Sequence, residues 1–168
     1  MFDETVLHHI KDQLIRKNQT IAVAESVTAG LLQLALASAE EAIRFFQGGI
    51  TAYNLGQKYK HLHVEPIHAE QCNCVDRKVA VEMARNVTDL FRSDWGIAIT
   101  GYATPVPESD HQLFAFYAIS FRKEILLEGK LEASEASEAP ALHVQKYYTD
   151  YLLTAFNNML AHRLFDEG

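Results

Sequence analysis

The segment that decides the fold runs from Thr20 to Leu36 and reads Thr-Ile-Ala-Val-Ala, then Glu-Ser-Val-Thr-Ala-Gly, then Leu-Leu-Gln-Leu-Ala-Leu. Residues 20–24 are short, apolar and partly β-branched, which predicts a buried strand. Residues 31–36 have the apolar pattern of a helix. A strand that passes through a turn of small residues into a helix is typical of α/β proteins. Such turns lie at the carboxyl end of the strand, where open sheets bind ligands.

The segments on either side extend this pattern. Helices are predicted over residues 3–17, 40–46, 55–61, 76–91 and 141–164, and strands over 50–53, 95–100, 113–121 and 124–132. Asp3 and Asp76 are expected to cap two of the helices. The Glu-Ala-Ser repeat within residues 133–140 predicts a mobile surface loop. We therefore expect one domain over residues 1–168, a three-layer α/β/α sandwich around a mixed sheet of about five strands.

Composition limits the classes of function. The chain has 168 residues, and 22 acidic against 15 basic side chains give a net charge of −7, which argues against binding to nucleic acid. No apolar run reaches the roughly 20 residues of a membrane helix, and the acidic N-terminus lacks the basic start of a signal peptide. We expect a cytoplasmic protein without membrane contact, in which Cys72 and Cys74 are reduced thiols.

Three side chains are candidates for nucleophilic catalysis. Ser26 follows the first strand directly, and Lys58 and Tyr53 follow the next strand, so all three are expected at the same edge of the sheet. A partly desolvated lysine can take the proton of a serine, because burial lowers the pKa of the lysine. The alternative is that Ser26 only caps the helix that we expect to begin near Val27.

Two further groups have both a catalytic and a structural interpretation. Glu25 could act as a general acid or base, or it could bind the N-terminus of the following helix. His61, His63 and His68 lack a suitably placed carboxylate, so we expect hydrogen-bonded histidines and no metal site.

Two motifs carry a resemblance to a known family. Residues 24–30 read Ala-Glu-Ser-Val-Thr-Ala-Gly, and residues 49–53 read Gly-Ile-Thr-Ala-Tyr, with Lys58 five positions later. Together they resemble the motif Ala-Glu-Ser-Cys-Thr-Gly-Gly and the tyrosine–lysine segment of the CinA C-terminal domain family, with the same distance between the motifs. Shorter matches at residues 81–84 and 99–103 extend the resemblance over most of the chain.

The resemblance implies an activity and a set of site residues. The family includes enzymes that deamidate nicotinamide mononucleotide, so Ser26 would attack the carboxamide, Lys58 would take its proton, and Tyr53 would sit beside them. The substrate-binding residues it implies are Glu25, Thr28, Gly30, Gly49, Thr100 and Gly101. It also implies a nucleotide-like ligand, no metal or redox cofactor, and association into a homo-oligomer.

Several segments depart from the family pattern. Ala29 replaces the second glycine of the first motif, and Leu55 replaces an asparagine of the second. The glycine-rich loop reads Ala-Thr-Pro-Val-Pro-Glu over residues 103–108, although glycines let backbone amides approach a phosphate. Phe114 stands near a family glycine, and residues 139–143 lack the expected arginine pair.

Three hypotheses follow from this combination. The first is a deamidase of nicotinamide mononucleotide, and the second is an amide hydrolase for a less anionic substrate. The third is a non-catalytic binding protein, in which the ring of Phe114 would fill the pocket. An open pocket with Lys58 near Ser26 would favour either enzyme.

Overall fold

A five-stranded sheet forms the middle layer of the molecule, in a computed structural model that describes residues 1–133 and 138–166. The strand order is β2-β1-β3-β4-β5. The strands are β1 (Ile21–Glu25), β2 (Phe46–Thr51), β3 (Trp95–Gly101), β4 (Phe114–Phe121) and β5 (Glu124–Glu132). β1 pairs in parallel with β2 and β3, whereas β4 is antiparallel to β3 and β5. The predicted mixed five-stranded sheet is confirmed.

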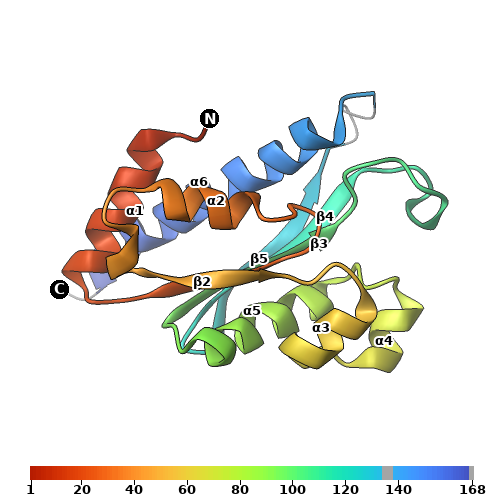
Figure 1. The fold of residues 1–168 in the computed structure, drawn as a ribbon, viewed down its shortest axis with the longest axis horizontal. Coiled ribbons are helices and arrows are strands. Elements are labelled where there is room, and N and C mark those ends of the chain that lie inside the picture. Colours follow the sequence, from red (N-terminus) through yellow and green to blue (C-terminus); the bar gives the residue numbers. More distant parts are fainter. Residues whose placement is uncertain (134–137, 167–168) are drawn as a thin grey trace.

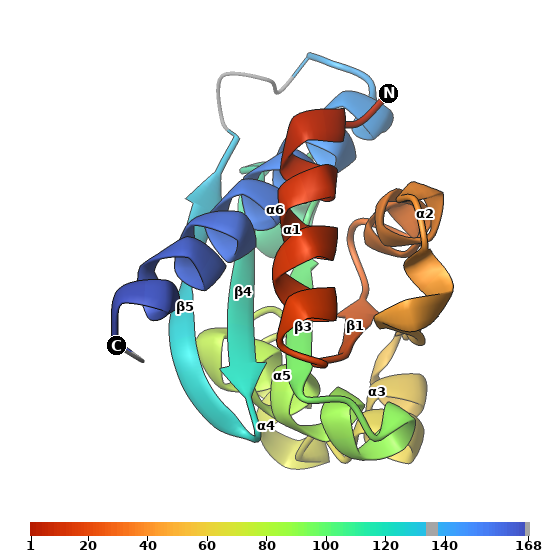
Figure 2. The ribbon, with the colours of Figure 1, turned by 90° about the vertical axis from the view of Figure 1, so that its left-hand side faces the viewer.

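Helices cover both faces of this sheet (Figure 1). One face carries α1 (Glu4–Arg16), α2 (Leu31–Ser38) and α6 (Ala141–Asp166). The other face carries α3 (Leu55–Leu62), α4 (Pro66–Gln71) and α5 (Arg77–Phe91). Figure 2 shows α1 and α6 side by side in front of the sheet and α5 behind it. The predicted three-layer sandwich is therefore confirmed.

The side chains of β1 divide between two hydrophobic cores. Successive side chains of a strand point to opposite faces. Ile21 and Val23 join the large core under α1, α2 and α6, while the alternate alanines of β1 join the core under α5. Small residues let α5 approach the sheet closely, and a Cβ at Gly96 would lie 2.3 Å from the backbone oxygen of Ala84.

The predicted helix caps are confirmed, and two element boundaries are corrected. Asp3 accepts hydrogen bonds from the first turn of α1, and Asp76 accepts one from Arg77 at the start of α5. The helix predicted over 40–46 is only a 3₁₀ turn over Ala42–Arg44, and the short helix α4 was not predicted. The predicted loop over residues 133–140 falls largely outside the described residues, because residues 134–137 are not among them.

The strand predicted over residues 50–53 begins earlier than expected. β2 starts at Phe46, so Gly48 and Gly49 lie inside the strand. Glycines are unfavourable inside regular strands and often mark a bulge. Here the pairing with β1 shifts register between Ile21 and Ala22, and Gly48 has a φ of 134°. The bulge explains why the glycines misled the prediction.

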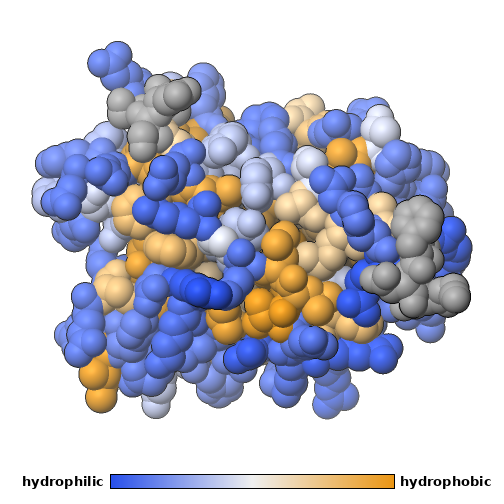
Figure 3. Space-filling view, turned by 180° about the vertical axis from the view of Figure 1, so that it is seen from behind, coloured by the Kyte–Doolittle hydropathy of each residue, from blue (hydrophilic) through white to orange (hydrophobic). Residues whose placement is uncertain are grey.

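The rear face of the molecule bears on the expected homo-oligomer. Apolar side chains gather near the middle of this face in Figure 3. On the edge strand β5, the apolar side chains of Ile125, Leu126 and Leu127 are half-buried. The homo-oligomer stays a prediction. Within the described residues, no helix is long and apolar enough to cross a membrane.

Candidate active site

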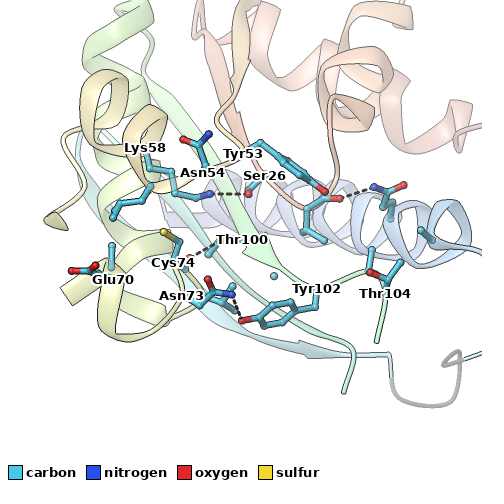
Figure 4. Close-up of a pocket in the computed structure, with 18 residues that line it drawn as sticks. Ser26, Tyr53, Asn54, Lys58, Glu70, Asn73, Cys74, Thr100, Tyr102 and Thr104 are labelled. Atoms are coloured by element: carbon cyan, nitrogen blue, oxygen red, sulfur yellow. Dashed lines mark hydrogen bonds between the residues drawn. The ribbon is translucent and has the colours of Figure 1, made fainter. Parts of the chain in front are cut away.

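The carboxyl ends of β1, β2 and β3 meet at one edge of the sheet and form a pocket of about 420 Å³. Ser26 follows β1 directly, Thr100 and Gly101 end β3, and Tyr53 and Lys58 come from the segment after β2. All five residues line the pocket. The sequence predicted that Ser26, Tyr53 and Lys58 lie at this edge of the sheet. Figure 4 shows Lys58 and Ser26 pointing toward each other inside it.

Lys58 and Ser26 are in direct contact. Lys58 Nζ donates hydrogen bonds to Ser26 Oγ and to the carbonyl oxygen of Ala52, both at 2.9 Å. Asn54 caps α3 with its side chain and so fixes the helix that carries Lys58. Because only 2% of Lys58 is exposed, desolvation lowers the pKa of its amine below 10.5. The buried thiol of Cys74 is its other electrostatic neighbour.

The structure contradicts the simpler interpretation of Ser26 as a helix cap. Helix α2 begins at Leu31, and its N-cap is Gly30, which makes no side-chain cap hydrogen bond. The backbone amide of Ser26 donates to the Ile99 carbonyl oxygen at 3.1 Å, while its hydroxyl accepts from Lys58. The serine is therefore held between β1 and β3 with its side chain directed at the amine.

Glu25 and Thr28 support the turn and do not line the pocket. Glu25 is fully buried, and its Oε1 accepts from Thr28 Oγ1 at 2.6 Å and from the Leu32 amide at 2.9 Å. Its Oε2 accepts from both the backbone and the side chain of Gln33 at 3.0 Å. A carboxylate at a helix N-terminus satisfies amides that have no intrahelical partner. Of the two interpretations of Glu25, the structure therefore supports the one in which it binds the following helix.

Gly30 and Gly49 are also outside the pocket lining. Gly30 has a φ of 105°, a conformation that favours glycine, at the turn into α2. A Cβ at Gly49 would lie 2.5 Å from the side chain of Gln33 and 2.7 Å from that of Val23. Both glycines shape the backbone around the site, so the expectation that they contact substrate directly is not supported by their positions.

The sequence did not single out several residues that line the pocket. Glu70, Asn73 and Cys74 come from α4 and the turn after it, Tyr102 follows β3, and Gln145 reaches in from α6. Two hydrogen bonds connect these parts. Asn73 Nδ2 donates to the Tyr102 hydroxyl at 3.0 Å, and Gln145 Nε2 donates to the Val27 carbonyl oxygen at 2.9 Å. No local motif marks these residues, because distant segments bring them together.

The ring of Phe114 does not fill the pocket. It lies edge-on to Tyr102, with ring centroids 5.3 Å apart, and Lys130 Nζ is 4.5 Å from its centroid. It is absent from the pocket lining in the described part of the chain. The pocket is open and Lys58 contacts Ser26, which is the arrangement that the two enzyme hypotheses require.

Comparisons with known proteins assign the sequence to one family. The sequence model of the CinA C-terminal domain matches residues 3–126. A CinA-like protein of Rippkaea orientalis is 35% identical over 133 residues, which cover 79% of this chain and 31% of the relative. A CinA-like protein of Synechocystis sp. is 39% identical over 104 residues, which cover 61% and 25%. The chain thus matches only about a quarter to a third of the length of these curated relatives.

Solved structures show the same fold. The competence damage-inducible protein A from Klebsiella pneumoniae superposes with a TM-score of 0.87 at 22% identity, covering 96% of this chain and 99% of that one. A CinA superfamily protein from Escherichia coli gives 0.83 at 24% identity, covering 94% and 89%. The fold is that of an α/β protein with its pocket at the carboxyl edge of a mixed sheet. The chain belongs to the CinA C-terminal domain family.

Proposed function

We propose that this chain hydrolyses a carboxamide, with Ser26 as the nucleophile and Lys58 as its base. The observation that carries the proposal is the 2.9 Å contact between Lys58 Nζ and Ser26 Oγ in an open pocket. A serine is a weak nucleophile until a neighbouring group removes its proton. Burial lowers the pKa of Lys58, which favours the neutral amine that this step needs.

The reaction divides into acylation and hydrolysis. Ser26 Oγ attacks the carbonyl carbon of the amide while Lys58 Nζ accepts the hydroxyl proton. Lys58 then gives that proton to the leaving nitrogen, the C–N bond breaks, and ammonia leaves an ester on Ser26. Water attacks the ester with Lys58 again as base, and the carboxylate product is released with the serine restored.

The turn after Ser26 supplies donors for the negative charge that develops on the carbonyl oxygen. The backbone hydrogen bonds of this turn use the amides of Ser26, Ala29 and Leu31. We assign the amide of Val27 to the oxyanion, because Val27 follows the nucleophile directly and lines the pocket. Preorganised backbone amides of this kind lower the barrier of acyl transfer by about 2.7–4 kcal/mol for each donor.

The charge of the pocket favours a substrate without a phosphate. The family resemblance implies nicotinamide mononucleotide, but Lys58 is the only cationic side chain among the lining residues, and Glu70 is acidic. A hydrogen bond to a charged group contributes about 1.5–3 kcal/mol, so each phosphate contact that is missing costs roughly ten- to a hundred-fold in affinity. We therefore favour the second hypothesis, an amide hydrolase of the same chemistry for a less anionic substrate.

Ammonia release tests the activity and the substrate class together. The two probes are nicotinamide mononucleotide and nicotinamide riboside, which differ only by the phosphate. Ser26→Ala and Lys58→Met should each remove at least 99% of turnover, about 2.7 kcal/mol of barrier. Ser38→Ala, on the last turn of α2, and Lys60→Met, on the exposed side of α3, are the matched controls.

The outcomes separate the three hypotheses. Serine-dependent release from the riboside at a higher kcat/KM than from the mononucleotide supports the favoured proposal. A higher kcat/KM for the mononucleotide would support the first hypothesis, a deamidase of nicotinamide mononucleotide. Ser26-dependent release from neither probe, nor from a panel of neutral aromatic amides, would indicate the non-catalytic family member.

A further inference from the structure

Three side chains with metal-binding atoms meet beside the pocket and outside it. His68 lies on α4, Cys72 is the C-cap residue of that helix, and Asp76 is the N-cap of α5. Their ligand atoms all lie within 4.8 Å of one another. We propose that His68, Cys72 and Asp76 form a binding site for a zinc ion.

Local backbone structure accounts for this grouping. Residues four apart on a helix lie on the same side, and the Cys72 amide donates to the His68 carbonyl oxygen at 3.2 Å. Asn73 and Cys74 both have positive φ, at 52° and 60°, so the chain reverses direction immediately after Cys72. The reversal brings Asp76 back to His68, and the two side chains are hydrogen-bonded.

The donor set fits zinc better than the alternatives. Imidazole nitrogen, thiolate sulfur and carboxylate oxygen are the three ligand types that zinc accepts, at about 2.0–2.3 Å. Magnesium and calcium prefer oxygen ligands alone. At zinc bond lengths, neighbouring ligand atoms are roughly 3–4 Å apart, so the distances within the cluster need to change by only about 1 Å. Three protein ligands leave a fourth position for water.

The exposure of the three side chains is also compatible with binding. The side chains of His68 and Asp76 are about a third exposed, at 31% and 32%, so an ion can reach them from solvent. The Cys72 thiol has only a long contact with the Ala69 carbonyl oxygen, at 3.7 Å. Zinc would displace the thiol proton to solvent, form the Zn–S bond, and separate His68 from Asp76 by coordinating both.

The site is close enough to influence the shape of the pocket. Glu70, Asn73 and Cys74, which lie between the three ligands in sequence, line the pocket wall. A bound ion would fasten the end of α4 to the start of α5 and so hold this wall in place. The ion would not contact Ser26 or Lys58, so the proposal stands apart from the proposed hydrolysis.

The sequence prediction grouped other residues than the proposed site does. It considered His61, His63 and His68 together and expected no metal. In the structure His61 is hydrogen-bonded to Gln57 on α3, and His63 is the C-cap residue of that helix. Only His68 meets a thiol and a carboxylate. The signal was the spacing of four residues from His68 to Cys72 and four more to Asp76.

The test is zinc and cobalt binding to the full chain after removal of metal with a chelator. We expect one zinc per chain by equilibrium dialysis, and with cobalt a thiolate-to-metal charge-transfer band in the near ultraviolet. Cys72→Ser should remove the band, and His68→Gln should weaken binding at least about 100-fold, since even outer-shell changes cost about 10- to 100-fold. His61→Gln and Cys74→Ala, which change a neighbouring histidine and thiol, should keep the stoichiometry and the band.

Three results would overturn the site. The first is no zinc bound at tenfold molar excess. The second is a cobalt band that survives Cys72→Ser. The third is a band that disappears in Cys74→Ala while Cys72→Ser retains it, which would move the ligand into the pocket. Circular dichroism of each variant is the control for folding, and it distinguishes a loss of zinc binding from a loss of structure.

Discussion

Replacing Glu25 by Gln tests whether this carboxylate supports the turn or contacts the substrate. The substitution keeps the size of the side chain and changes one acceptor oxygen into an NH₂ group. Thr28 can adapt to this change, because a hydroxyl both donates and accepts. The amides of Leu32 and Gln33 cannot, so one of them must lose its acceptor.

The expected magnitude follows from these contacts. A buried amide left without an acceptor costs about 1–3 kcal/mol. Loss of the negative charge at the N-terminus of α2 adds about 0.3–1 kcal/mol. The free energy of unfolding should therefore fall by about 1.3–4 kcal/mol. In a domain of this size that lowers Tm by roughly 3–16 °C.

Urea unfolding followed by circular dichroism measures this loss, with Glu124→Gln as the control. Glu124 is an exposed carboxylate at the start of β5, and its replacement should change stability by less than about 0.5 kcal/mol. Turnover by folded Glu25→Gln protein should fall far less than turnover by Ser26→Ala. Unchanged stability together with abolished turnover would refute the supporting role and would indicate that Glu25 contacts the substrate.

Two further predictions concern Lys58 and Gly49. Burial lowers the pKa of Lys58, so kcat/KM should rise as pH increases through that pKa and level off before 10.5. A profile that falls over this range would contradict the role of Lys58 as the base. Between the lowered pKa of Lys58 in the folded protein and its value of 10.5 in the unfolded chain, the unfolded chain binds more protons than the folded one. The free energy of unfolding of the wild type relative to Lys58→Met should therefore also rise with pH in this range, as unfolding at several pH values would show. Gly49→Val should lower the free energy of unfolding by about 1–3 kcal/mol, because its side chain would overlap Val23 and Gln33. Gly56→Ala, whose Cβ would be 3.5 Å from its nearest neighbour, is the control, and equal melting temperatures for the two variants would refute the packing argument.

The fold could be predicted because its signals are local. The buried run of β1, the small-residue turn and the caps at Asp3 and Asp76 each depend on neighbours in sequence. The boundary of β2 could not be predicted, because the bulge at Gly48 depends on the contact of this residue with Phe91 and on the register with β1. Glycine alone did not distinguish a strand interior from a strand start.

The candidate site was predictable only as far as strand ends determine it. Ser26 and Lys58 meet because parallel strands place their carboxyl ends at the same edge. The pocket walls formed by Asn73, Tyr102 and Gln145 depend on how α4, α6 and the loop after β3 pack. The hydrophobic periodicity of the sequence does not predict that packing. Both interpretations of Glu25 stayed open in the sequence, because a carboxylate next to a nucleophile has the same sequence signature whether it reacts or supports a helix.

Separate parts of the chain position Ser26 and Lys58. Because of this separation, the loop over residues 103–112 can differ in sequence while the two side chains stay in contact. Ser26 is held by β3 through its amide and by a turn that Glu25 anchors, and Lys58 is held by the capped helix α3. None of these contacts involves residues 103–112, of which only Ala103 and Thr104 reach the pocket. Changes in that loop can therefore alter which substrate binds without moving the serine from the lysine. Under the proposed function, a change of substrate with unchanged chemistry is the simplest explanation for the contact of Ser26 with Lys58 beside a loop that contains no glycine over residues 103–112.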